Sequence, residues 1–142
     1  MRQSTRHYLV AAAAVSVGAW RAVRRVEVVG DSMLPTLRPG DRLLVLRPAP
    51  ARPGALVAVA DPRLPARTML KRVTAVGAEG VTVLGDNPPA STDSRTLGPL
   101  APAAIRGRAF YRYFPASRRG RLSPEGDVDR RRGPGAGRRP AG

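Results

Sequence analysis

The chain has 142 residues and is strongly basic, because 25 arginines and lysines stand against 10 aspartates and glutamates, for a formal net charge of +15. It contains no cysteine, which excludes a thiol nucleophile and disulfide support. Aromatic residues make up only 4% of the chain and do not accompany the arginines along a strand or helix, so we do not expect nucleic acid as a partner. A solvated tail or an anionic membrane surface accounts better for the charge.

Residues 1–25 are predicted to form a basic flank and a short hydrophobic segment. Residues 8–20 carry no charge, and arginines flank them on both sides. A membrane-spanning helix needs ~20 apolar residues, whereas the apolar centre of a secretory signal needs about 7–15. Three interpretations stay open: a short or interfacial membrane anchor, a signal-like segment, and an alanine-rich helix on the domain. Localisation, cytoplasmic or membrane-associated through residues 8–20, is therefore left undecided.

Residues 26–115 are predicted to form a single small all-β domain. No helical periodicity longer than a turn or two is present, and short apolar segments alternate with proline and glycine turns. The segment 61–68, which contains two prolines, is predicted to be an exposed loop. The predicted strands cover residues 26–29, 43–46, 55–60, 69–76, 81–84 and 104–114.

Residues 116–142 have a different composition. From residue 117 onward there are eight arginines, three acidic residues and almost nothing apolar. Such a segment cannot bury enough apolar surface to offset the entropy of ordering, so we expect a disordered basic tail.

A turn-rich loop between the first two predicted strands carries the candidate nucleophile, Ser32. Glycine, proline and aspartate surround it between Gly30 and Asp41. A serine on a constrained loop can face a cleft and attack a carbonyl. It can equally well be a serine that only caps a turn.

A serine nucleophile needs a neighbouring base, and Lys71 is the candidate. The only histidine, His7, lies in the basic N-terminal flank, and arginine stays protonated in proteins. Lys71 is the only lysine, and strand alternation places it on one face with Met69 and Val73. An apolar face disfavours the ammonium form, which suits a general base. The other interpretation is an ordinary surface lysine.

Three segments in the right order resemble the sequence boxes of type I signal peptidases, which are serine proteases with a serine–lysine dyad. The first is Ser-Met-Leu-Pro-Thr-Leu at 32–37, with Gly-Asp at 40–41. The second is Lys-Arg-Val at 71–73, and the third runs from Gly-Asp-Asn at 85–87 through Ser-Thr-Asp-Ser-Arg at 91–95 to a glycine at 98. Residues 90–95 and 112–115 most resemble the compact members that mature nickel-containing superoxide dismutase. The resemblance implies a domain of coiled antiparallel sheets.

The resemblance also implies roles for the residues of the active site. Ser32 is the expected nucleophile and Lys71 its general base, and the backbone N–H of Ser32 is the expected oxyanion-hole donor. Some family members carry a hydroxyl two residues before the nucleophile; here that position is Gly30, which could contribute only its backbone. Ser91 matches the serine whose hydroxyl orients the lysine.

Other positions in the three boxes are expected to support the site rather than transfer protons. Asp93 and Arg95 match an ion pair that braces the loop, and Asp41 is expected to cap or brace the turn after the nucleophile. Met33 and Leu34 line either the substrate groove or the core. Neither a metal nor a cofactor is expected.

The function predicted from the resemblance is that of a serine endopeptidase that removes an N-terminal pro-peptide. The substrate would be an extended peptide segment of a precursor, docked against a sheet edge. A nickel-type superoxide dismutase precursor is the preferred substrate, and a secretory preprotein cleaved by general signal peptidase activity is the alternative. A non-catalytic basic binding module on a protease fold is the alternative from another class.

Overall fold

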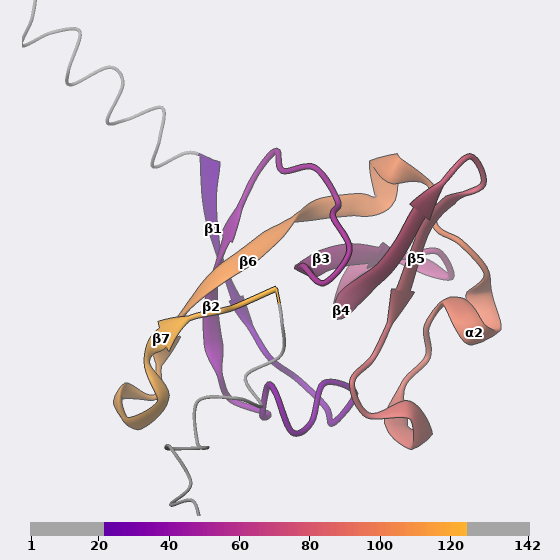
Figure 1. Cartoon of the computed structure of the whole chain (residues 1–142). Helices are drawn as coiled ribbons and strands as arrows, with labels where there is room; N and C mark the ends of the chain where they lie inside the picture. Colours follow the sequence, from indigo (N-terminus) through magenta and orange to yellow (C-terminus); the bar gives the residue numbers. More distant parts are fainter. Residues whose placement is uncertain (1–21, 125–142) are drawn as a thin grey trace, which may run out of the picture.

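A computed structural model describes residues 22–124 of the chain (Figure 1). These residues form a seven-stranded antiparallel sheet in the order β1-β2-β6-β3-β4-β5, with β7 paired to β6. The predicted all-β fold is confirmed, and each of the six predicted strands overlaps an observed one. The strands are β1 (Val23–Glu27), β2 (Arg42–Leu46), β3 (Leu56–Asp61), β4 (Leu64–Gly77), β5 (Gly80–Leu84), β6 (Ile105–Phe114) and β7 (Gly120–Arg121), with helix α2 (Ser94–Leu97) and the 3-10 turns η1 (Pro88–Ala90), η2 (Pro102–Ala104) and η3 (Ala116–Arg118).

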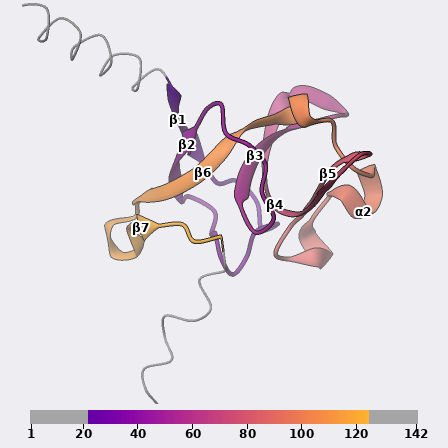
Figure 2. The same ribbon diagram turned by 45° about the horizontal axis from the view of Figure 1, so that its top comes forward.

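The sheet coils because the long strand β6 changes partners along its length. β6 pairs with β2 and with β3, and register shifts interrupt both ladders. Each such bulge adds local twist. Figures 1 and 2 show β6 crossing the domain from the side of β1 and β2 to the side of β3, β4 and β5.

Strand β3 lies between two apolar clusters, which explains its uninterrupted apolar sequence. Leu56 and Ala58 pack into a first cluster with residues of the β1–β2 region, whereas Val57 and Val59 pack into a second cluster with β4 and β5. The alternation of side chains along a strand therefore divides the core into two parts. Strand β4, which carries Lys71, follows directly after this doubly buried strand.

The first strand lies nearer the N-terminus than predicted, so the boundary at residue 26 is corrected. Val28 leaves the sheet, and its buried side chain joins the first core cluster. Its backbone N–H donates to Asp41 O at 2.8 Å, and its carbonyl accepts from Gly40 N at 2.9 Å. These two bonds close the loop that follows β1, and they end the strand before Val29.

The exposed loop predicted for residues 61–68 is mostly strand instead. Asp61 pairs with Leu64 across a tight turn, where its carboxylate accepts from Arg63 N at 2.9 Å. Such an aspartate turn replaces a long loop. Ala60 pairs with Thr68, so residues 65–67 bulge out of the ladder, which is where a proline is tolerated.

The folded domain also extends beyond the predicted boundary at residue 115. Strand β7 pairs with β6, Leu122 N donates to Phe110 O at 3.0 Å, and Leu122 packs against the first core cluster. One apolar side chain in an arginine-rich segment was too weak a signal for the sequence analysis. The remainder of the predicted tail, from residue 125, and the hydrophobic segment at 8–20 lie outside the described residues.

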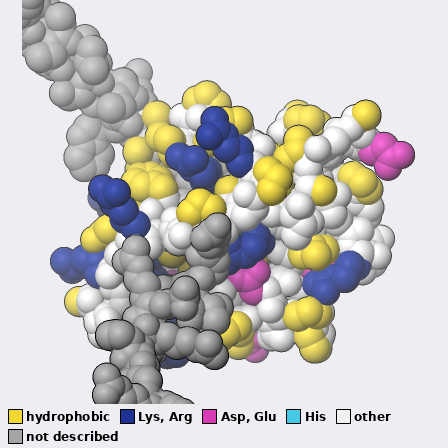
Figure 3. All heavy atoms as spheres, viewed as in Figure 1, with side chains coloured by type: hydrophobic (Ala, Val, Ile, Leu, Met, Phe, Trp, Pro, Cys, Tyr) yellow, Lys and Arg dark blue, Asp and Glu magenta, His cyan; other side chains and the backbone are white. Residues whose placement is uncertain are grey.

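Two further properties of the described part bear on partners. Among residues 22–124, no helix combines the length and apolar character needed to cross a bilayer. Figure 3 shows the basic side chains of one face in several separate groups, with apolar side chains between them.

Candidate active site

The loop that carries Ser32 is anchored by apolar side chains on both sides of a helical turn. Leu37 N donates to Met33 O at 2.9 Å, and both side chains are fully buried in the first core cluster. Met33 is therefore a core residue, one of the two places that the sequence allowed for it. Leu34 is half-buried and does not line the cavity described below.

Asp41 closes this loop, as the sequence predicted, but its partners extend much further. Its carboxylate accepts from Arg38 N at 2.9 Å and pairs with Arg112 at 3.4 Å and with Arg118. Arg112 also donates to Thr36 O at 3.1 Å. The C-terminal part of the domain therefore braces the loop of the candidate nucleophile.

Lys71 lies in the middle of β4, opposite Val57 of the buried strand β3. Only 2% of Lys71 is exposed, and Met69 and Val73 on the same face belong to the second core cluster. The predicted apolar environment is confirmed. Burial lowers the pKa of Lys71; the Asp93 charge opposes this shift, and the Arg67 charge adds to it.

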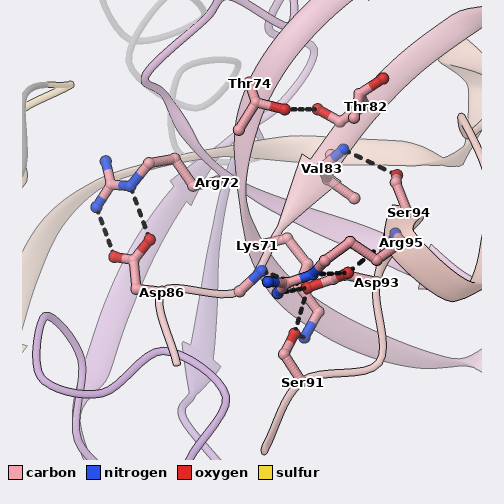
Figure 4. A network of polar contacts seen from close by, with 11 residues as sticks. Lys71, Arg72, Thr74, Thr82, Val83, Asp86, Ser91, Asp93, Ser94 and Arg95 are labelled. Carbon is pink, nitrogen blue, oxygen red and sulfur yellow. Dashed lines mark hydrogen bonds and ion pairs between the residues drawn. The ribbon is translucent and has the colours of Figure 1, made fainter. Parts of the chain in front are cut away.

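The Lys71 amine meets a short chain of hydrogen bonds (Figure 4). Its Nζ donates to Ser91 Oγ at 3.0 Å, and Ser91 Oγ donates to Asp93 Oδ2 at 2.7 Å. Arg95 donates to the same carboxylate from Nε at 3.0 Å and from Nη2 at 2.5 Å. The structure thus brings together four residues that the sequence assigned to one site.

Asp93 is fully buried and stays ionised. Burial alone would raise the pKa of Asp93, but hydrogen bonds from Arg95, from the Gly85 N–H at 2.8 Å and from Ser91 outweigh it and hold that pKa well below its usual range. Asp93 also caps helix α2 by accepting from Arg95 N. This environment supports a bracing role and no proton transfer.

Gly85 allows the Ser32 loop and the Ser91 loop to approach each other. A Cβ at this position would lie 2.1 Å from Ser91 Oγ and 2.6 Å from Ser32 O. The sequence indicated no role for Gly85 beyond its place in the third box. The spatial requirement explains why that segment begins with a glycine.

Arg72, Asp86 and Asn87 also connect the boxes, although the sequence analysis gave them no role. Asp86 accepts from Arg72 Nε at 3.0 Å, from Arg72 Nη2 at 2.9 Å and from Thr36 Oγ1 at 2.7 Å. Asn87 N donates to Ser32 O at 2.9 Å. The polar residues next to Lys71 and Ser91 therefore hold the loop of Ser32 in place.

Ser32 and Lys71 line one cavity of about 380 Å³. Residues 27–32 form one wall, Arg63 and residues 67–71 form the other, and Ala90 and Thr92 complete it. Gly30 is part of the first wall. Among the described residues, no group of three histidine, cysteine, aspartate or glutamate side chains could hold a metal ion.

A coiled antiparallel sheet that brings a loop serine and a buried lysine to one cleft fits the class of signal peptidase-like proteases. The family described as "Signal peptidase, peptidase S26" matches residues 1–83 and 74–114, and the chain belongs to this family. The family assignment predicted from the three boxes is thereby confirmed.

Relatives with curated names are subunits of membrane proteases. The Arabidopsis thaliana mitochondrial ATP-independent inner membrane protease subunit 1b is 34% identical over 125 residues, covering 67% of this chain and 72% of the relative. The Danio rerio mitochondrial inner membrane protease subunit 2 is 30% identical over 135 residues, covering 77% and 73%. The subgroup that matures nickel superoxide dismutase rests on the sequence resemblance alone.

Proposed function

We propose that this chain is a serine endopeptidase in which Ser32 is the nucleophile and Lys71 the general base. The observation that carries the proposal is a lysine amine, almost completely buried, in the wall of the cavity that Ser32 also lines. Burial favours the neutral amine, the only form that can accept a proton from a hydroxyl.

The reaction would proceed by acyl transfer. Ser32 Oγ bonds to the scissile carbonyl carbon while its proton passes to Lys71 Nζ. The C–N bond then breaks, and Lys71 returns the proton to the leaving amine. A water molecule then gives a proton to Lys71 and attacks the ester carbonyl carbon. The bond between that carbon and Ser32 Oγ breaks, and Lys71 passes its proton to Ser32 Oγ, which releases the new carboxyl end and restores the hydroxyl.

Ser91 is suited to orient the lysine. Its hydroxyl proton is donated to Asp93 at 2.7 Å, so it presents a lone pair to the Lys71 N–H at 3.0 Å. A neutral amine held by one of its N–H groups keeps its own lone pair available for the Ser32 proton. Asp93, fixed by Arg95, would hold the Ser91 hydroxyl proton on its own side. The hydrogen bonds would then always run from Lys71 to Ser91 and from Ser91 to Asp93.

The oxyanion would be stabilised by backbone donors of the nucleophile loop. Within residues 22–124, the Ser32 N–H has no protein acceptor, although Ser32 lines the cavity. Gly30 lines the same cavity and can contribute only its backbone. A free N–H beside the attacking oxygen is the usual design of an oxyanion hole.

The substrate would be an extended peptide segment near the N-terminus of a precursor. The nickel superoxide dismutase precursor stays the specific prediction, on the basis of residues 90–95 and 112–115. The relatives' names include "inner membrane protease", which supports the alternative of a membrane-delivered preprotein. Both substrates would be cleaved by the same reaction, and they differ only in which precursor's peptide segment enters the cleft.

The test is incubation of the purified full chain with both precursors, followed by mass spectrometry of their N-termini. We expect one precursor to be trimmed by the wild type, and neither by Ser32→Ala or Lys71→Arg. Thr74→Val is the matched control, because Thr74 is an exposed residue on the Lys71 strand whose hydroxyl donates to Thr82 O at 3.3 Å. Trimming by Ser32→Ala would overturn the proposed chemistry.

The alternative of a binding module makes the opposite prediction. Because residues 116–124 belong to the fold, the tail should be removed after Pro124 rather than after Pro115. A function that survives Ser32→Ala and disappears with this truncation would favour a binding module.

A further inference from the structure

Asn87 holds the backbone on both sides of the candidate nucleophile. Its backbone N–H donates to Ser32 O at 2.9 Å, and its side-chain Nδ2 donates to Asp31 O at 2.9 Å. The two acceptors are the carbonyls immediately before and after the Ser32 Cα. No other residue among those described donates to both carbonyls.

The contact with Asp31 O has a consequence for the Ser32 N–H. The carbonyl of Asp31 and the N–H of Ser32 belong to one planar trans peptide unit and point in opposite directions. Asp31 and Ser32 line the cavity, whereas Asn87 does not. A carbonyl drawn towards Asn87 therefore turns the Ser32 N–H away from Asn87, where it meets no protein acceptor within residues 22–124.

The Asn87 side chain is not used for the role that its position would suggest. Asn87 stands at the N-cap of turn η1, where an asparagine side chain usually accepts from the turn's own backbone. It makes no such capping bond. The other donor to Asp31 O is Leu34 N at 3.2 Å, a longer bond within the loop. Among residues 22–124, Asn87 thus supplies the shorter bond to Asp31 O and the only one from outside the loop.

We infer that Asn87 is a positioning residue that aims the Ser32 N–H at the oxyanion through the Asp31–Ser32 peptide. This inference rests on the proposed function. Asn87 does not line the cavity. Because the oxyanion forms only in the transition state, the effect of Asn87 should appear in kcat rather than in KM. Loss of an oxyanion donor typically costs ~10²–10³-fold in kcat. Misdirection of a donor that remains present should cost less, about 10-fold.

The test compares Asn87→Asp and Asn87→Ala with wild type and Thr74→Val on a peptide substrate. Asn87→Asp keeps the shape and the backbone donor, but its carboxylate cannot donate to Asp31 O. We expect kcat, measured on the high-pH plateau, to fall about 10-fold in both variants, with KM changed less than ~2-fold. The inhibition constant of a peptide aldehyde, whose adduct with Ser32 carries the oxyanion, should rise by the same factor as kcat falls. Thr74→Val should match the wild type in kcat, in KM and in the inhibition constant.

If Asn87 only stabilised the fold, its variants would have a lower melting temperature, but kcat and the affinity for the aldehyde would not fall by the same factor. Wild-type kcat and aldehyde affinity in a folded Asn87→Asp would overturn the inference, and so would a rise in KM at unchanged kcat. If Asn87→Ala does not fold, Asn87→Asp decides. Failure of the proposed function looks different, because then the wild type itself would not cleave, or Ser32→Ala would cleave equally well.

Discussion

Replacement of Lys71 by methionine should separate activity from stability. Folding buries the Lys71 amine, and burial is the main reason that its pKa lies below the ordinary 10.5. At pH values below the lowered pKa the amine is charged in both the folded and the unfolded chain, so the wild type carries the full cost of burying that charge. Methionine fills a similar volume and carries no charge, so it does not have this cost. We therefore expect Lys71→Met to be more stable than the wild type at pH values below the lowered pKa of Lys71.

The pH dependence of this difference follows from proton linkage. Between the lowered pKa of the folded state and 10.5, the unfolded chain binds a proton that the folded chain does not. The free energy of unfolding of the wild type therefore rises with pH in this window, by at most about 1.36 kcal/mol per pH unit. Lys71→Met lacks this rise. Above the window the wild type keeps its bond to Ser91, worth about 0.5–1.5 kcal/mol, and the advantage of the variant should vanish.

The assay is urea unfolding of both proteins at half-unit intervals from about pH 6 to 11, a range set by the ordinary lysine pKa. The difference between the two curves cancels every other titrating group. Lys71→Arg is the control, because arginine cannot lose its proton and should be destabilised at every pH. Peptide cleavage should fall by about 10²–10⁴-fold in Lys71→Met. A stability difference that stays flat up to pH 11 would refute the reasoning, and so would full activity.

Two further substitutions test the surroundings of the amine. The positive charge of Arg67 lowers the pKa of Lys71, so Arg67→Gln should raise that pKa and move the ascending limb of kcat/KM to higher pH; an unmoved limb in the pH–rate profile would contradict this. Gly85→Ala would place a Cβ 2.1 Å from Ser91 Oγ, so we expect a loss of about 1–3 kcal/mol in urea unfolding together with lost cleavage. Gly77→Ala, where a Cβ meets nothing within 4 Å, should do neither, and equal effects at the two glycines would contradict the proposed crowding.

The sequence predicted the strands well because most of them carry a local signal. β3 and β5 are apolar segments between glycine or proline turns, and their observed bounds differ from the predicted ones by one residue. The errors fall where long-range contacts decide. Leu122 becomes part of the fold through its packing on the first core cluster. Pro62 lies in the tight turn between Asp61 and Leu64, and Pro65 is accommodated by a bulge rather than by a loop.

The candidate site was predicted as a set of residues but not as a connected structure. The single lysine and the spacing of the boxes pointed to Ser32, Lys71 and Ser91, which the fold brings to one region. The roles of Asp86 and Asn87 depend on contacts with Thr36 and Asp31, which lie 50 and 56 positions away in the sequence. A pattern of residue types contains no information about which carbonyl a side chain will meet.

The ion pairs of the buried carboxylates also differ in how far they could be predicted, because some join neighbours in the sequence and others join distant residues. Asp61 and Asp93 each pair with an arginine two residues further along, so both ion pairs follow from an Asp-x-Arg spacing. In the first pair, hydrogen bonds from Arg63 lower the pKa of Asp61 to about 2. Asp41 is as deeply buried, but its arginines lie some 70 residues away in sequence, at Arg112 and beyond. Arg38 and Arg42 stand close to Asp41 in the sequence, yet the Arg42 side chain pairs with Glu27, and the salt bridges of Asp41 are with Arg112 and Arg118. A buried carboxylate needs such partners, so these contacts hold the C-terminal part of the domain against the loop of Ser32.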